Sequence, residues 1–233
     1  VRKPEDIHEI FHQLTAEARS AFGNGDVYLE KFITSLRHIE VQLLRDTHKN
    51  TKVLGLRDCS VQRNNQKLIE ESGSTTLPAD FEQQVYAYTE AIANEINYVG
   101  AGTVEFIFDL ANHCIYFMEM NTRVQVEHPV TEVITGVDIV QEQIRVAFGE
   151  KLRYRQKDIS LRGHAIEFRI NAEDPYTFVP SPGKIAFYHP PGGPGIRVDS
   201  HIYQGYTVPP HYDSMVAKVI AYGDTREQAI RRM

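Results

Sequence analysis

The stretch Met118-Glu-Met-Asn-Thr-Arg-Val-Gln-Val-Glu-His-Pro129 holds the densest group of polar side chains in this chain of 233 residues. Period-two alternation predicts that its first residues end a strand over 114–121. A second strand is expected over 103–110, and the short polar segment 111–113 joins the two as a hairpin. The chemistry of this chain is therefore expected where the second strand of a hairpin ends.

Oxygen donors on this hairpin suggest a metal site. Glu119 and Asn121 are two residues apart on one strand, so their side chains share a face of the sheet. If the register brings Glu105 beside Glu119, two carboxylates and an amide oxygen converge, a set that suits Mg²⁺. Zinc is disfavoured because soft ligands are missing. An acidic hairpin face in water is the alternative.

The remaining pattern predicts an α+β fold with an antiparallel sheet. Helices are expected over 4–22, 79–98, 130–135 and 138–148, and strands over 27–33, 37–45, 52–56, 163–172 and 214–222. In 37–45, His38, Glu40 and Gln42 alternate with apolar residues, which predicts a half-buried strand whose polar face looks into a cleft. Residues 175–212 are rich in Pro and Gly and predict short strands and turns. Thr225 is expected to cap a final helix that has no stop signal, as in a fragment.

Composition narrows the function classes. With 25 Lys and Arg against 31 Asp and Glu, the formal net charge is −6, which argues against a nucleic-acid partner. No apolar run is long enough for a membrane span. The two cysteines cannot form a disulfide framework or a zinc site alone, so a reducing, intracellular setting is expected.

The segment Glu119-Met-Asn-Thr-Arg-Val-Gln-Val-Glu-His-Pro-Val-Thr-Glu132 closely resembles the central signature of biotin carboxylases, which are members of the ATP-grasp superfamily. Further segments similar to that family follow one another in the family's order, at 30–33, 57–63, 163–174, 180–183 and 205–215. The resemblance implies an ATP-grasp domain over 1–155, with an antiparallel sheet and flanking helices. It implies a biotin-carboxylase C-terminal-type, β-rich domain over 156–233. Both are expected to be partial, without the N-terminal domain and the Gly-rich lid loop.

The same resemblance implies an activity for the parent protein, namely ATP- and bicarbonate-dependent carboxylation of biotin through a carboxyphosphate intermediate. The implied cofactors are ATP, Mg²⁺ or Mn²⁺, and biotin on a carrier, with bicarbonate as a substrate. The implied partners are a biotin carboxyl carrier protein or domain, a carboxyltransferase such as that of an acyl-CoA carboxylase, and a second copy in a homodimer. A cytoplasmic setting is expected, or the mitochondrial matrix in a eukaryote, and the fragment is expected to be inactive alone.

Roles for individual residues follow from the resemblance alone. ATP would be bound by Glu30, Lys31, Phe32 and Ile33 at adenine and by His38, Gln62 and Asn65 near the ribose and phosphates. The metal would be held by Glu105, Glu119 and Asn121, and bicarbonate by Arg123, Gln125 and the Val126 main chain. Lys67 would face the reacting phosphate or bicarbonate, Glu127 would be the general base, and Arg169 would stabilise the biotin oxyanion.

Plainer interpretations exist for several of these residues. His38 fits a surface histidine, Lys67 fits a solvated helix-face pair with Glu70 and Glu71, and Arg169 fits a cross-sheet ion pair with Glu167. Glu127 fits a helix start. For the whole chain, the alternatives are another ATP-grasp carboxylate ligase or a non-catalytic assembly module of a carboxylase complex. Asn65 departs from the family, which has a His there, and an Asn cannot carry charge.

Overall fold

The computed structural model describes residues 3–233. They divide into two compact units, and the boundary along the chain lies between Thr34 and Ser35. In the first unit, a short 3₁₀ helix (η1, Pro4–Asp6) leads into α1 (Ile7–Phe22), which confirms the predicted helix. Gly23 ends α1 with a φ of 75°, a left-handed conformation that glycine adopts without a steric cost.

The strand expected over 27–33 is wrong, because these residues have no regular secondary structure. Their apolar run favours an extended conformation, but a strand forms only beside another strand. In the part of this first unit that the structure describes, residues 3–34, no strand is present to pair with the run.

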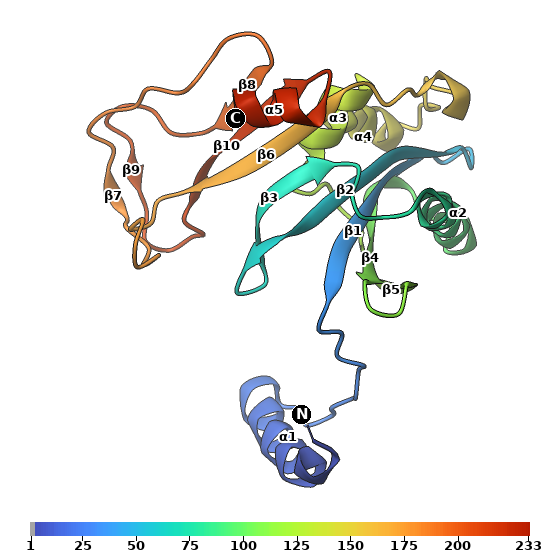
Figure 1. Ribbon diagram of the computed structural model, residues 1–233, viewed down its shortest axis with the longest axis vertical. Coiled ribbons are helices and arrows are strands. Elements are labelled where there is room, and N and C mark those ends of the chain that lie inside the picture. The colour runs from blue at the N-terminus through green and yellow to red at the C-terminus, as the bar shows by residue number, and fades with distance from the viewer. Residues whose placement is uncertain (1–2) are drawn as a thin grey trace. The chain divides into compact units, whose positions relative to one another are not determined.

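The second unit is built on one antiparallel sheet, whose order over the described residues is β5-β4-β1-β2-β3-β6-β10-β8 (Figure 1). Its first five strands in the chain are β1 (Leu36–Arg45), β2 (Thr51–Arg63), β3 (Gln66–Ser72), β4 (Gly100–Asp109) and β5 (Cys114–Asn121). The other three are β6 (His164–Asn171), β8 (Ile196–Ser200) and β10 (Met215–Gly223). A small separate sheet pairs β7 (Gly183–Lys184) with β9 (Thr207–Val208).

The helices of this unit are α2 (Ala79–Glu95), α3 (His128–Thr135), α4 (Ile139–Ala147), a 3₁₀ turn η2 (Gln156–Asp158) and α5 (Arg226–Arg232). The predicted helices over 79–98, 130–135 and 138–148 are thus confirmed with small shifts at their ends. The predicted final helix is also confirmed, since the Thr225 side chain accepts a hydrogen bond from the backbone N–H of Gln228 and caps α5.

Both faces of the central strand β1 are buried. Ile39, Val41 and Leu43 point into the main hydrophobic core together with Val85 and Ala93 of α2. The opposite face carries His38, Glu40 and Gln42, which are also buried. The prediction that one face of this strand is exposed is therefore wrong. The prediction that polar and apolar residues occupy opposite faces is confirmed. A fully buried polar row must be satisfied by other protein groups.

The extent of the β2–β3 hairpin was not predicted. Residues 57–68 are charged and polar, so the predicted strand covered only 52–56. In the structure β2 runs to Arg63 and β3 begins at Gln66. The connecting residues Asn64 and Asn65 have φ values of 50° and 63°. Asn tolerates this left-handed conformation better than most residues, and two such residues in a row make a tight hairpin connection.

The large sheet continues through the region where the two predicted domains would meet. Residues 155 and 156 lie between α4 and β6, and β6 pairs directly with β3. The division at 155/156 stays a prediction, because the shared sheet contains strands from both sides of it. Among the residues that the structure describes, none of the helices has the length and apolar character needed to cross a membrane.

Candidate functional site

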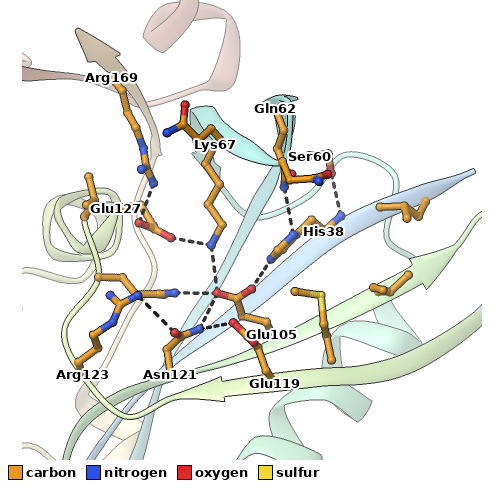
Figure 2. Close-up of a pocket in the computed structure, with 17 residues that line it drawn as sticks. His38, Ser60, Gln62, Lys67, Glu105, Glu119, Asn121, Arg123, Glu127 and Arg169 are labelled. Carbon is orange, nitrogen blue, oxygen red and sulfur yellow. Dashed lines mark hydrogen bonds and ion pairs between the residues drawn. The ribbon is translucent and has the colours of Figure 1, made fainter. Parts of the chain in front are cut away.

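An open cleft of about 530 Å³ lies over the polar face of the sheet, beside the strand ends of the β4–β5 hairpin. Figure 2 shows its lining side chains, which come from β1, β2, β3, β4, β5, β6 and the turn before α3. Twelve residues predicted as site residues are among them: His38, Gln62, Asn65, Lys67, Glu105, Glu119, Asn121, Arg123, Gln125, Val126, Glu127 and Arg169. The four others, Glu30, Lys31, Phe32 and Ile33, belong to the first unit, so their predicted role at adenine stays a prediction.

The β4–β5 register brings the predicted oxygen donors together. Glu105 and Glu119 are direct cross-strand partners, and Thr103 pairs with Asn121. The Asn121 amide nitrogen donates to Glu105 Oε1 at 2.9 Å and to Glu119 Oε1 at 3.1 Å. The predicted convergence of the three side chains is confirmed, but Asn121 turns its amide nitrogen to the carboxylates, and its Oδ1 atom accepts from Arg123. One amide thus bridges the two carboxylates, the first of them buried and the second exposed to solvent.

This donor set fits a hard divalent cation. Glu105, Glu119 and Asn121 offer oxygen ligands, and exposure of Glu119 leaves room for water or phosphate to complete the coordination of Mg²⁺. The tightest clusters of potential ligands lie deeper, at His38, Glu40 and Glu105 and at Glu40, Cys59 and Glu127. Lys67 already supplies a positive charge to the acids of both clusters, so the outer edge is the better place for an ion.

Lys67 lies at the centre of the charged floor of the cleft. Its ammonium group contacts Glu40, Glu105 Oε1 at 3.0 Å and Glu127 Oε1 at 2.9 Å (Figure 2). An ammonium group has three N–H donors, and each finds a carboxylate. The solvated helix-face pair with Glu70 and Glu71 is therefore wrong, because Lys67 lies on a strand and points inward.

The charges of the floor keep two of its acids ionised. Burial favours neutral Glu105, but its contacts with His38 and Lys67 outweigh burial and lower the pKa to about 2. Burial likewise favours neutral Glu127, but the charges of Arg57, Lys67 and Arg169 lower its pKa below the ordinary value. Both groups are therefore carboxylates at neutral pH.

Glu127 and Arg169 form an ion pair on one side of the cleft. The Arg169 Nη2 atom donates to Glu127 Oε2 at 3.1 Å, and its Nε atom donates to Glu70 Oε1 at 2.7 Å. Arg169 thus pairs with Glu70 and Glu127, and the expected ion pair with Glu167 is absent from the contacts of the described residues. Glu127 occupies the N-cap position of α3, but its side chain makes no capping hydrogen bond and binds these cations instead.

His38 is a buried histidine with defined partners, so the surface interpretation is wrong. It is 7% exposed, and its Nε2 atom lies 2.7 Å from Glu105 Oε2. Its Nδ1 atom lies 3.1 Å from the Gln62 amide nitrogen, which also donates to the Cys59 carbonyl at 2.8 Å. The two ring nitrogens thus lie between an amide and a carboxylate.

Arg57 is the main residue of the site that sequence reasoning missed. Its guanidinium is fully buried and donates to the side-chain oxygens of Glu40, Gln42, Thr103, Gln125 and Thr131. Gln125 in turn donates to Glu105 Oε1 at 2.7 Å. The one sequence feature that points to this network is the alternation of polar residues in β1. Such residues are expected to pair with polar residues of the adjacent strands.

Arg123 lies at the open side of the cleft. It is exposed, and its Nη2 atom donates to Asn121 Oδ1 at 3.3 Å while its Nη1 atom donates to the Val124 carbonyl at 3.2 Å. Unlike Arg169, it contacts no carboxylate among the described residues. Each Nη atom has a second N–H, so the guanidinium can also donate to a small anion.

Family comparisons agree with this fold. A model of the ATP-binding domain of the carbamoyl-phosphate synthase L chain matches residues 1–155, and a model of the biotin carboxylase C-terminal domain matches residues 167–233. The biotin carboxylase of Haemophilus influenzae is 54% identical over 233 residues, which are 100% of this chain and 52% of that protein. The chain thus spans about half the length of such relatives.

Solved structures give the same result. A biotin carboxylase complex from Campylobacter jejuni superposes with a TM-score of 0.93 at 46% identity, covering 99% of this chain and 51% of that one. The biotin carboxylase domain dimer of the Hydrogenobacter thermophilus 2-oxoglutarate carboxylase, in complex with MgADP, ADP and bicarbonate, gives 0.91 at 50% identity, covering 98% and 51%. The fold and cleft define an ATP-grasp protein. Within that class, the chain belongs to the biotin carboxylase family.

Proposed function

We propose that the whole protein containing this chain carboxylates biotin on a carrier, using ATP and bicarbonate. The observation that carries this proposal is the arrangement of the cleft, where the ionised Glu127 faces Arg169 on one side and the acidic hairpin edge lies on the other (Figure 2). Arg123, with no carboxylate partner among the described residues, lies on the same edge. The relatives named above support the proposal because they are biotin carboxylases along the full length of this chain.

The nucleotide side of the reaction would use the outer edge. Glu105, Glu119 and Asn121 would hold Mg²⁺, which when bound offsets the negative charge of the phosphates. His38 and Gln62 line the cleft beside this edge and would contact the ribose or phosphates. Phosphoryl transfer depends on positioning and charge neutralisation, which fixed carboxylates and the partly buried ammonium group of Lys67 would supply.

The bicarbonate side would use the bottom and the rim of the cleft. Arg123 would bind the anion through its guanidinium, and Gln125 and the Val126 main chain would complete its pocket. Glu127 would accept the bicarbonate proton, which makes the anion a better nucleophile toward the γ-phosphate. Each oxygen of Glu127 accepts from one cation, Lys67 or Arg169, and keeps a second lone pair for this proton. Arg169, which is held beside Glu127, would stabilise the biotin oxyanion.

The test is ATP cleavage by the whole protein with and without bicarbonate and free biotin. We expect phosphate release to require bicarbonate and to increase with biotin. In Arg123→Ala, carboxybiotin formation should be lost while nucleotide binding is largely retained. A rate of ATP cleavage that does not change when bicarbonate is withdrawn would refute the proposal, and would favour a ligase for another carboxylate.

We further propose the partners that such a reaction needs. A biotin carrier must deliver biotin to the cleft, and a carboxyltransferase must consume the carboxybiotin. A homodimer is supported by the dimeric biotin carboxylase domain among the structural relatives. Light scattering of this chain over a concentration series tests the dimer, and a constant monomer mass would contradict it. A cytoplasmic setting stays a prediction.

A further inference from the structure

Two buried acids lie behind Arg169, and the reaction proposed above does not use them. Glu70 on β3 and Glu167 on β6 are direct cross-strand partners in the antiparallel pair. Both side chains are 0% exposed. Because paired residues project to the same face of a sheet, the two carboxyl groups lie side by side in the protein interior.

Most of the oxygen atoms in this pair lack a hydrogen-bond partner. Glu70 Oε1 accepts from Arg169 Nε, but Glu70 Oε2 and both oxygens of Glu167 have no donor among the residues that the structure describes. Two adjacent buried carboxylates would each be desolvated and would repel each other. A proton between them removes the repulsion and one of the two buried charges, since a carboxylic acid can donate to its neighbour. The remaining carboxylate stays paired with Arg169.

The charges around the pair are divided unequally between its two acids. Arg169 forms an ion pair with Glu70, whereas both oxygens of Glu167 have no partner among the described residues. Arg169, Lys218 and Glu127 are the charged groups that act on both members of the pair or on Glu167 directly. The other titratable groups near this face are Lys67 of β3, which is shared with the acids of the floor, Cys59 of β2, and His128 at the start of α3.

We propose that Glu70 and Glu167 share a single proton, and that this pair is a positioning device for Arg169. Glu167 as the neutral acid donates to Glu70 Oε2, which fixes the Glu70 carboxylate in place. Glu70 Oε1 then holds Arg169 Nε, and the guanidinium is aimed at Glu127. Glu70 and Glu167 touch no substrate, so their effect on the reaction passes through Arg169. The inference rests on the proposed function for the roles of Arg169 and Glu127.

The direction of the pKa shifts agrees with this geometry. Burial raises the pKa of Glu167 well above its ordinary value, and the charge of Glu70 raises it further. Burial also raises the pKa of Glu70, while the charge of Arg169 lowers it. The acid that stays neutral longest is therefore Glu167, and Glu70 is the carboxylate that faces Arg169.

The first experiment detects the proton without any activity. Infrared spectra of the protein, recorded in H₂O and D₂O over a pH series, report the carbonyl stretch of protonated carboxyl groups. We expect a D₂O-sensitive band that persists at neutral pH, is lost in Glu167→Gln, and disappears at lower pH in Glu70→Gln. Glu71→Gln is the matched control, because Glu71 is on the other face of β3, with His164 and Arg226. It should leave the band unchanged.

The second experiment measures positioning in the whole protein, as the pH profile of kcat for biotin carboxylation. Loss of the shared proton adds a charge beside Glu70, so the wild type should lose rate on the alkaline side. Glu167→Gln mimics the neutral acid and should keep kcat near neutral pH without that alkaline loss. Glu70→Gln should lower kcat by about tenfold or more, because a hydrogen bond to a charged group contributes roughly one to two powers of ten.

The outcomes separate the two ideas. Absence of any protonated-carboxyl band at neutral pH in the wild type would overturn the shared proton, whatever the activity. A band that is present, together with an alkaline loss that is unchanged in Glu167→Gln, would overturn the positioning role. A wild type without bicarbonate-dependent ATP cleavage would instead refute the proposed function, and the infrared result would still decide whether the pair holds a proton.

Discussion

Replacement of Arg57 tests whether the buried charges of the floor hold the sheet together. Each of its three guanidinium nitrogens donates, and the acceptors are the side chains of Glu40, Gln42, Thr103, Gln125 and Thr131. Arg57→Met preserves most of the side-chain volume but leaves Glu40 with one cation fewer. Removal of one partner of a buried ion pair costs about 3–5 kcal/mol, so we expect a loss of that size in the free energy of unfolding.

Urea denaturation followed by circular dichroism measures this loss. With a slope of about 3 kcal/mol per molar urea, the midpoint should fall by about 1–2 M. Arg155→Met is the matched control, because Arg155 is exposed and pairs with Asp158 at 2.7 Å on the surface. Its midpoint should stay at that of the wild type, since exposed ion pairs contribute little.

A double variant shows whether loss of the guanidinium beside Glu40 is the cause. Arg57→Met combined with Glu40→Gln removes the carboxylate that Arg57→Met leaves without its guanidinium partner, so part of the lost stability should return. If the two single losses simply add, or if Arg57→Met loses less than about 1 kcal/mol, the reasoning that buried charge pairing holds this sheet is refuted.

Three further predictions concern pH, capping and the floor of the cleft. The pKa of Glu105 is about 2 in the folded chain against an ordinary 4.5, so its contribution to stability is complete above pH 4.5 and is lost as pH falls toward 2. The Glu105→Gln variant should therefore show a weaker dependence of stability on pH over that interval. An acid-unfolding transition that does not change in this variant would contradict the assignment. Thr225→Ala removes the side-chain cap of α5 and should cost about 1 kcal/mol in urea unfolding, whereas Thr225→Ser should retain the cap and most of the stability. The Lys67→Met variant removes an ammonium group that contacts three carboxylates, so the pKa of Glu105 should rise. Carbon NMR titration of the Glu105 carboxyl group would detect this rise. A pKa that stays at about 2 would show that His38 alone accounts for the shift.

The sequence predicted the parts of the fold in which one physical signal dominates. The β4–β5 hairpin was predictable because period-two alternation and a polar turn agree, and the side chains of Glu105, Glu119 and Asn121 then follow from the pleat. The helices were predictable from apolar spacing. The strand over 27–33 was wrong because an apolar run does not reveal whether a partner strand exists.

The interior of the site was not predictable in the same way. Polar residues in a strand ordinarily predict exposure, yet Glu40 and Arg57 are fully buried because each satisfies the other. β3 was missed for the same reason, since Lys67 and Glu70 gave its sequence the character of a loop. Strands that carry a buried ion-pair network therefore lack the apolar pattern from which strands are predicted. Only contacts between strands that are distant in the sequence show that such a network exists.

The bottom and the rim of the cleft differ in how firmly their charged side chains are held, and this difference suggests how the site works. At the bottom, Lys67 and Arg169 are held by buried carboxylates, so charge is fixed in position before any ligand arrives. At the rim, Glu119 and Arg123 are exposed and make few contacts, so they can rearrange around an ion or an anion. Fixed charge in a low-dielectric floor stabilises developing charge without reorganisation, whereas an exposed rim allows entry and release. Substitutions at the floor should therefore impair both folding and turnover, and substitutions at the rim should impair turnover alone.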